Sequence, residues 1–202
     1  MAAMNEELIL ASASPARARL LAAAGLDFRV EAAAVDEEAV RCAYRAGGAE
    51  AAECALALAE LKARRISERH PGALVVGADQ ILVCDGLWFD KPAGMAGARA
   101  QLQALRGKLH ELATAVCAVA AGERVWHAVS RPLLTMRAFS DAFLDAYLAA
   151  EGSAILGSVG AYRIEGRGIQ LFADIDGDYF AVLGLPLLPL LAFLRERGAL
   201  RQ

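Results

Sequence analysis

The chain has 202 residues, of which 57% are hydrophobic and 22% are charged. This length allows one domain or at most two small ones, and the apolar content excludes a wholly disordered chain. With 21 Lys and Arg against 24 Asp and Glu, the net charge of −3 argues against a protein that coats nucleic acid. It does not exclude a small anionic ligand, which needs only a local basic cluster.

The sequence shows neither the pattern of a secretory signal nor that of a membrane-spanning helix. Residues 1–7 carry acidic residues where a secretory signal is basic, and the most apolar stretch, residues 180–194, contains two prolines. We therefore expect a cytoplasmic protein with no membrane partner and no nucleic-acid partner. The cysteines are too dispersed for a disulfide scaffold or a metal site, so they are expected to be buried or half-buried thiols: Cys42, Cys54, Cys84 and Cys117.

Apolar runs separated by turn residues predict alternating strands and helices. The first of them is a strand at residues 8–11, followed by a helix that Ser14 caps and Gly25 ends. A long helix is predicted at 49–69, and an apolar strand run at 73–78 reaches Asp79 and extends to residue 84. The other predicted strands are 28–30, 87–89, 109–120, 125–129, 133–136, 169–172 and 179–182, and the other helices are 97–105, 140–150 and 186–195.

This mixture of helices, strands and hairpins predicts an α/β protein with a mixed sheet. The sequence shows no internal repeat and no linker, so a single domain over residues 1–202 is expected. Segment 157–168 contains four glycines. Such a segment is typical of a loop where the backbone approaches a ligand or turns sharply.

The first candidate for chemistry is the segment SASPAR, residues 12–17. A strand that passes through hydroxyl groups into a helix presents free N–H groups and the positive end of the helix dipole to an anion. Arg17 would add a guanidinium fork for phosphate. The alternative is an ordinary helix cap, and the motif by itself favours that interpretation.

The second candidate is Asp79, at the end of an apolar strand run. Ligands often bind at such a strand end, and an aspartate there can act as a general base or hold a divalent metal. The alternative is a turn aspartate that caps local backbone. Further candidates are the acidic cluster 36–38 for a metal and the three lysines for phosphate, although each is also typical of a solvated surface: Lys62, Lys91 and Lys108.

Five segments in order along the chain carry a resemblance. They are LILASASPARARLL, VVGADQILVCDG with LWFDKP, ALRGKLHELATAV, GAYRIEGRG and AVLGLPLLPLLAFL. Together they resemble the Maf-like family of nucleoside triphosphate pyrophosphatases over nearly the whole chain. The resemblance implies a fold similar to that of the inosine triphosphate pyrophosphatases, with an elongated mixed β-sheet, flanking helices and a central cleft. Members are often dimeric, so a homodimer is expected.

The resemblance also implies a reaction. Water attacks the α-phosphorus of a nucleoside triphosphate, giving the monophosphate and pyrophosphate, with a divalent cation such as Mg²⁺, Mn²⁺ or Co²⁺ as cofactor. The family's general base corresponds to Asp79, and its functional lysines correspond to Lys62 and Lys91. Its acidic residue after the second strand corresponds to Asp36 or Glu37, so Glu37 and Asp79 are the expected metal ligands.

The resemblance further implies a substrate-binding set. The phosphate-binding motif corresponds to Ser12, Ser14 and Arg17. One family branch, which hydrolyses 7-methyl-GTP, has a tryptophan at the position of Ala16, where it could stack on a cationic purine.

Two other specificity positions do agree with the 7-methyl-GTP branch. These are Gln80 and Glu165, where the dTTP/UTP branch has threonine and glutamine. Trp88 could supply a substitute aromatic ring, although a core residue of a hairpin is the simpler interpretation. The expected function is a house-cleaning hydrolase of nucleoside triphosphates, with 7-methyl-GTP as one candidate substrate. The alternative is a nucleotide-binding regulator of septum formation without turnover.

Overall fold

The computed structural model describes residues 6–200, which divide into two compact units. The first unit takes in the chain up to Gln80, Thr114–Ser130 and the chain from Asp178 onward. The second takes in Ile81–Ala113 and Arg131–Gly177. The expectation of a single domain therefore stays a prediction, and each unit is described by itself.

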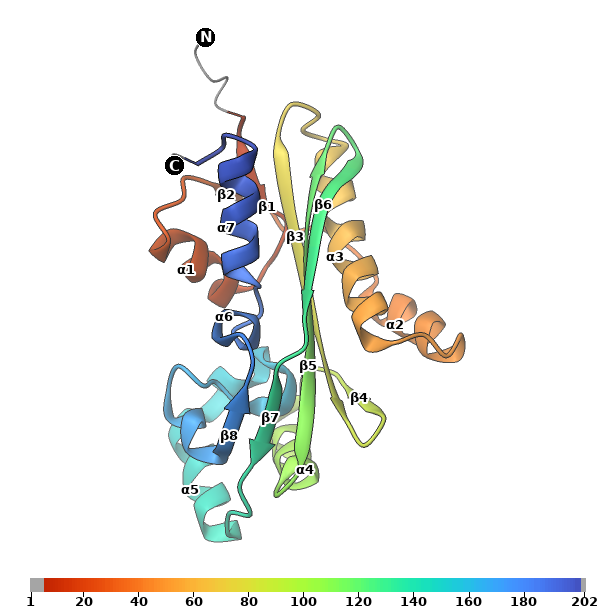
Figure 1. Ribbon diagram of the computed structural model, residues 1–202. Coiled ribbons are helices and arrows are strands. Elements are labelled where there is room, and N and C mark those ends of the chain that lie inside the picture. The colour runs from red at the N-terminus through yellow and green to blue at the C-terminus, as the bar shows by residue number, and fades with distance from the viewer. Residues whose placement is uncertain (1–5, 201–202) are drawn as a thin grey trace. The chain divides into compact units, whose positions relative to one another are not determined.

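The first unit combines parallel strands with one antiparallel pair. Strand β1 (Leu8–Leu10) lies between β2 (Arg29–Val30) and β3 (Leu74–Cys84), parallel to both, with Ile9 opposite Val75 (Figure 1). The part of β5 (Leu109–Ala120) that lies in this unit pairs antiparallel with β6 (Glu123–Ser130). The helices of the unit are α1 (Pro15–Ala23), α2 (Glu37–Ala46), α3 (Ala51–Ser67), α6 (Tyr179–Val182) and α7 (Leu187–Glu196).

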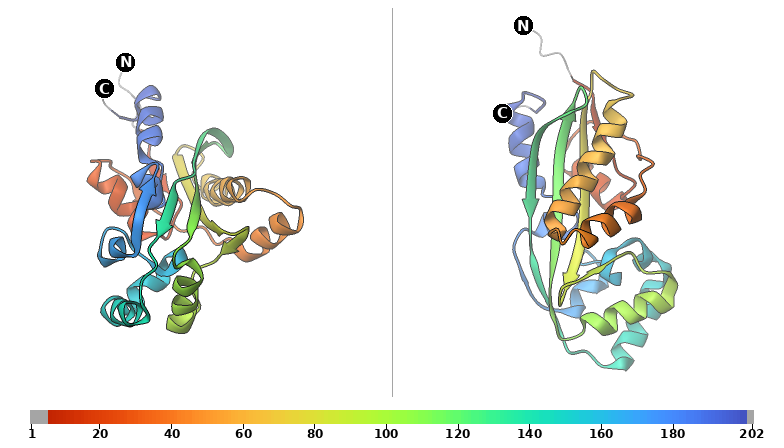
Figure 2. Two further views of the ribbon diagram at one scale, coloured as in Figure 1. Left: turned by 60° about the horizontal axis from the view of Figure 1, so that its bottom comes forward. Right: turned by 90° about the vertical axis from the view of Figure 1, so that its right-hand side faces the viewer.

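The helices of the first unit cover both faces of these strands. Because side chains alternate along a strand, Val76 and Ala78 of β3 pack with Leu190 on the side of α1 and α7, whereas Val75 packs on the side of α3. Figure 2 shows α3 running along the strands. A Cβ atom at Gly77 would lie 2.0 Å from the carbonyl oxygen of Ala59, so only glycine lets α3 approach this closely.

The second unit is built on antiparallel strands. In this unit β3 forms a hairpin with β4 (Leu87–Phe89) through the Asp85-Gly86 turn, and β5 pairs with β7 (Leu133–Met136), which pairs with β8 (Phe172–Asp176). Its remaining elements are α4 (Gly94–Leu105), α5 (Asp141–Glu151) and the short 3-10 helices η1 (Gly152–Gly157), η2 (Val159–Ala161) and η3 (Arg167–Leu171).

The strand order of the sheet is β2-β1-β3-β5-β7-β8, with β4 beside β3 and β6 beside β5. Its parallel and antiparallel pairs, flanked by helices, confirm the predicted α/β class with a mixed sheet. Among the described residues, no helix is both long enough and apolar enough to cross a membrane.

Two local predictions are wrong, and one helix was not predicted. Residues 179–182 form helix α6 rather than a strand, because the Asp178 side chain accepts a hydrogen bond from the Phe180 N–H and caps a helical turn. Residues 169–171 belong to η3, and the strand begins only at Phe172. The helix α2 was not expected, although Asp36 caps it and acidic residues occupy its first turn.

The thiols and the glycine-rich segment follow the sequence more closely. All four cysteines are free, and three are buried as expected, whereas Cys42 on α2 is exposed. Segment 157–168 turns sharply within η2 at Gly160, which has a φ of 77°. The prediction of a sharply turning backbone is thereby confirmed.

Candidate functional site

Asp79 is the most deeply buried carboxylate in the candidate site, at 4% exposure. It lies within β3 rather than beyond its end, so the strand-end position expected from the sequence is wrong. The strand directs its side chain to the α3 side, where the Lys62 ammonium donates to Oδ1 at 2.6 Å. The Arg41 guanidinium donates to Oδ2 at 3.4 Å. Each carboxylate oxygen of Asp79 therefore has its own cation.

Lys62 lies on the buried face of α3. It is 7% exposed and follows Leu58 and Ala59, one turn earlier on the same face. A lysine is rarely buried unless its charge is paired. Here its ammonium contacts two carboxylates, Asp79 Oδ1 at 2.6 Å and Glu37 Oε1 at 2.7 Å. The predicted grouping of Asp79, Lys62 and Glu37 is thus realised within the first unit.

Arg41 is a site residue that sequence reasoning missed. It lies one helical turn after Glu37 on α2 and contacts Glu37 Oε2 at 3.1 Å as well as Asp79 Oδ2. The residues Glu37, Lys62, Asp79 and Arg41 therefore form a closed ring in which each carboxylate touches both cations, and we call it the charge ring. A helix predicted to begin after Asp36 would have placed Arg41 beside Glu37.

Arg17 and Ser12 form a second polar group, at the start of α1. The Arg17 side chain donates from Nε to the Gly184 carbonyl at 2.7 Å and from one terminal nitrogen to the Ala78 carbonyl at 2.8 Å. The same nitrogen donates to Ser12 Oγ at 3.2 Å. Since the peptide of Ala78 joins it to Asp79, these contacts place Arg17 next to the charge ring along β3.

The electrostatics of Arg17 differ from those of the charge ring. Arg17 is 9% exposed, and among the described residues its hydrogen-bond acceptors are all uncharged. Burial lowers the pKa of its guanidinium, and the negative charges of Asp79 and Glu37 oppose that shift. Arginine keeps its charge even so. The structure therefore holds a buried cation whose direct partners carry no negative charge, which favours an anionic ligand.

Ser12 has a hydrogen to donate. Its hydroxyl oxygen accepts hydrogen bonds from Arg17 and from the Ser14 N–H, at 3.2 Å each. A hydroxyl that accepts twice still has one O–H donor. Ser14 itself caps α1 through a long contact of 3.5 Å with the Arg17 N–H, and the half-buried Ala16 presents only a methyl group. The helix-cap interpretation and the anion-site interpretation of this segment are thus compatible.

Gln80 points away from Asp79. Adjacent residues of a strand face opposite sides of a sheet, and the Gln80 amide nitrogen donates to Thr114 Oγ1 at 2.8 Å and to the Ala181 carbonyl at 2.9 Å. Its partners therefore lie on β5 and α6, not in the charge ring.

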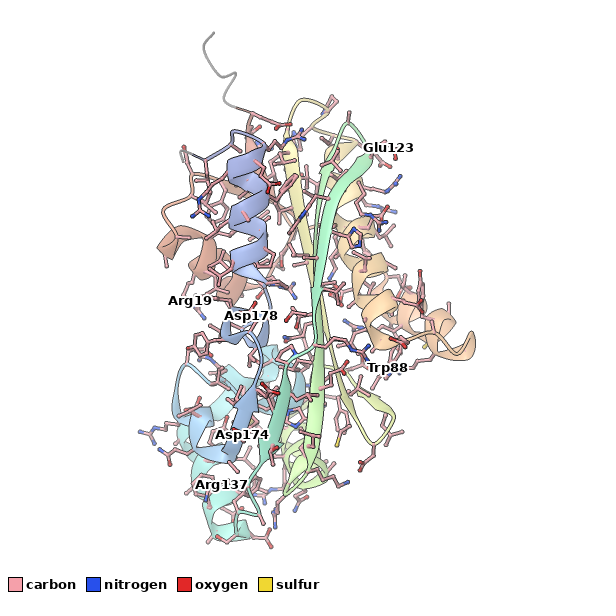
Figure 3. All side chains as sticks on the ribbon, in the orientation of Figure 1. Arg19, Trp88, Glu123, Arg137, Asp174 and Asp178 are labelled. Carbon is pink, nitrogen blue, oxygen red and sulfur yellow. The ribbon has the colours of Figure 1, made fainter. Side chains whose placement is uncertain are left out.

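The other expected site residues belong to the second unit. Lys91 follows β4 and is exposed, and Glu165 contacts Arg163 at 3.4 Å. Trp88 lies on β4, where Figure 3 labels it, and it is half-buried as expected of a hairpin residue. Because the two units are described separately, the role of Lys91 and Glu165 beside Asp79 stays a prediction.

The carboxylates of the charge ring fit a particular kind of metal site. Among the described residues no group of three or more His, Cys, Asp or Glu side chains is placed to enclose an ion. Mg²⁺, however, is usually held by one or two carboxylates together with water and substrate phosphates. Glu37 and Asp79, which converge on Lys62, match that donor set.

Comparison with known proteins identifies the class. The family model described as "Maf-like protein" matches residues 7–197, and the chain belongs to this family. It is 59% identical to a nucleoside triphosphate pyrophosphatase of Paramagnetospirillum magneticum, over 95% of this chain and 99% of the relative. It is 57% identical to a protein of the same name from Granulibacter bethesdensis, over 96% and 98%. A 7-methyl-GTP pyrophosphatase of Mesorhizobium japonicum is 49% identical, over 98% and 99%.

Proposed function

We propose that the protein hydrolyses the α–β phosphoanhydride of nucleoside triphosphates, releasing the nucleoside monophosphate and pyrophosphate. One observation carries the proposal. Asp79 is a buried carboxylate on β3, and the buried guanidinium of Arg17, whose partners are uncharged, binds the carbonyl of the preceding residue, Ala78. The first can accept a proton and the second can bind a phosphate. The names of the relatives support the same reaction.

The phosphate groups would be bound by donors that already converge. The Arg17 guanidinium, the Ser12 hydroxyl and the first N–H groups of α1 belong to one short segment of chain. A helix N-terminus and a guanidinium both favour phosphate. Because these donors are held in place before the substrate arrives, little reorganisation is needed on binding.

In the proposed chemical step, Asp79 acts as the general base. As a water oxygen forms its bond to the α-phosphorus, the Asp79 carboxylate takes the water proton, and the bond from the α-phosphorus to the α–β bridging oxygen breaks. Pyrophosphate leaves with the bonding electron pair. Lys62 holds Asp79 in place through Oδ1 at 2.6 Å and places a positive charge beside the reacting groups.

A divalent cation fits this arrangement as the cofactor. Glu37 and Asp79 would hold it, and when bound it supplies positive charge that offsets the charge of the phosphates. Mg²⁺, Mn²⁺ and Co²⁺ are the ions to test. Lys91 of the second unit is proposed as a further cation for the triphosphate, and Glu165 is proposed to accept hydrogen bonds from the base.

The base preference is proposed to favour guanine nucleotides, including 7-methyl-GTP. A carboxylate such as that of Glu165 can accept the paired N–H groups of a guanine edge, which thymine does not offer. The name of the Mesorhizobium japonicum relative supports 7-methyl-GTP as a substrate to test. Ala16 supplies no ring for stacking, so unmodified GTP belongs in the same comparison. Assembly as a homodimer and a cytoplasmic location stay predictions.

The test is a panel of nucleoside triphosphates that includes 7-methyl-GTP, incubated with the protein and Mg²⁺. Pyrophosphate and the monophosphate should appear in equal amounts, and EDTA should stop their release. Nucleotide binding without any pyrophosphate release would contradict the enzyme and favour the regulatory alternative. Release of inorganic phosphate with a diphosphate product would contradict cleavage at the α–β bond.

A further inference from the structure

Three hydrogen-bond donors converge on the buried Ala181 residue at the end of α6. Its carbonyl oxygen accepts from Gln80 Nε2 at 2.9 Å, from the Thr114 hydroxyl at 3.0 Å and from the Gly184 N–H at 2.9 Å. Asp178, labelled in Figure 3, caps the other end of the same short helix. Hydrogen bonds from a residue of β3, from a residue of β5 and from its own backbone therefore hold the turn that follows α6.

The orientation of the Gln80 carboxamide follows from these contacts. The Thr114 hydroxyl donates its hydrogen to Ala181, so its oxygen is an acceptor toward Gln80 Nε2 at 2.8 Å. The Val182 carbonyl, at 3.3 Å, is also an acceptor. All three of these groups are hydrogen-bond acceptors toward Gln80. The atom of the carboxamide that faces them must therefore be the amide nitrogen, which donates, and not the oxygen. The donating capacity of Gln80 is thus directed at the protein.

This turn also positions the Arg17 side chain. Gly184 has a φ of 99°, a conformation that favours glycine, and a Cβ atom there would lie 3.4 Å from Arg17 Nε. In this conformation the Gly184 carbonyl accepts from Arg17 Nε at 2.7 Å. A continuous chain of hydrogen bonds therefore runs from Gln80 and Thr114 through Ala181 and Gly184 to the guanidinium.

We propose that Gln80 and Thr114 are positioning residues for Arg17. Both residues thereby contribute to the affinity for the triphosphate, and for Gln80 this role is additional to the choice of base that the family resemblance implies. The inference rests on the proposed function, because it takes Arg17 to bind a phosphate. It follows that a change at Gln80 weakens the binding of a ligand that has no base at all.

The test uses Mg²⁺ and inorganic tripolyphosphate as the probe, with affinity measured by calorimetry. The variants are Gln80→Thr, whose side chain is too short to reach Ala181, and Thr114→Val, which replaces the hydroxyl by a methyl group. Each should raise the Kd for tripolyphosphate by about fivefold, the usual effect of losing one or two hydrogen bonds. Thr114→Ser, which keeps the hydroxyl, should bind as the unaltered protein does. Gln103→Thr makes the same chemical change at an exposed position and should also have no effect.

A second readout separates positioning from base recognition. For Thr114→Val, which leaves Gln80 in place, the value of kcat/KM should fall by one common factor for ATP, GTP, CTP, UTP and 7-methyl-GTP. A changed ratio between purine and pyrimidine nucleotides, with unchanged tripolyphosphate affinity, would overturn the inference. Circular dichroism confirms that each variant is folded. If the unaltered protein neither bound tripolyphosphate nor released pyrophosphate, the proposed function itself would have failed.

Discussion

The two units treat their buried ionisable side chains in opposite ways. In the first unit, the charge ring pairs each of its carboxylates with two cations. In the second unit, His110 is 2% exposed and contacts the Tyr162 hydroxyl through Nε2 at 2.8 Å. Its other ring nitrogen has no hydrogen-bond partner among the described residues, and burial lowers its pKa to about 4.

This difference distinguishes a candidate active site from a hydrophobic core. Burying charges costs free energy that pairing only partly recovers, so the buried pair of Asp79 and Lys62 is better explained by chemistry than by stability. A neutral histidine that packs against Tyr162 and Phe172 needs no such explanation. Arg17 resembles neither case, because it is charged while its direct partners are neutral. We propose that its charge binds a phosphate of the substrate.

The largest effect is expected when the charge ring loses its base. Asp79→Asn keeps the shape of the side chain and its contact with Lys62 but cannot take a proton at neutral pH. Turnover should fall by roughly 10²–10⁴-fold, as for the loss of other general bases. The variant should keep the circular dichroism spectrum of the unaltered protein.

A matched control is Asp145→Asn, since Asp145 is an exposed aspartate that pairs with Arg99. It should retain full activity. If Asp79→Asn retained activity comparable to that of this control, Asp79 would not be the base and the contrast between the two units would lose its functional meaning.

The second prediction concerns His110 and the stability of the fold in acid. Its pKa is about 4 in the folded protein against 6.5 for the unperturbed group, so between these values the unfolded chain binds more protons. The free energy of unfolding should therefore decrease as the pH falls from 6.5 toward 4, with His110 accounting for roughly 3 kcal/mol of the loss.

Urea unfolding as a function of pH measures this contribution. In His110→Leu the acid-dependent loss between these pH values should shrink by the same amount. In His127→Leu, a change at an exposed histidine of β6, it should stay as in the unaltered protein. Equal slopes for all three proteins would mean that His110 is not held neutral by burial.

The smallest effect is expected at Arg41. Its guanidinium occupies Asp79 Oδ2 and Glu37 Oε2, the oxygens that a divalent cation would otherwise contact. Arg41→Ala should therefore bind Mn²⁺ more tightly, by about fivefold, in calorimetry without nucleotide. Arg64→Ala removes an equal charge that pairs with Glu60 and should not change the affinity. Weaker Mn²⁺ binding by Arg41→Ala would show that Arg41 does not compete with the metal.

Much of the fold could be predicted because local patterns agreed with the tertiary structure. Strands 109–120 and 133–136 coincide with β5 and β7, which turn residues delimit clearly. At 179–182 the apolar aromatic run favoured a strand, but the cap at Asp178 and the tertiary contacts of Ala181 select a helix. Local propensity was outweighed there by hydrogen bonds to residues far away in the sequence.

The candidate site was predictable only in part, and for a related reason. The family resemblance implied Asp79, Lys62 and Glu37, but it did not imply Arg41, which lies on a helix that was not predicted although acidic residues mark its first turn. The opposite directions of Asp79 and Gln80 follow from strand periodicity alone. The partners of Gln80 do not, because they come from β5 and α6, which no local pattern brings together.

The central claim is that water attacks the α-phosphorus of a nucleoside triphosphate with Asp79 as base. Turnover in water enriched in ¹⁸O, followed by mass spectrometry of the products, tests it most directly. The account predicts that the isotope enters the nucleoside monophosphate and that the pyrophosphate stays unlabelled. Isotope in the pyrophosphate, or in free inorganic phosphate, would contradict it.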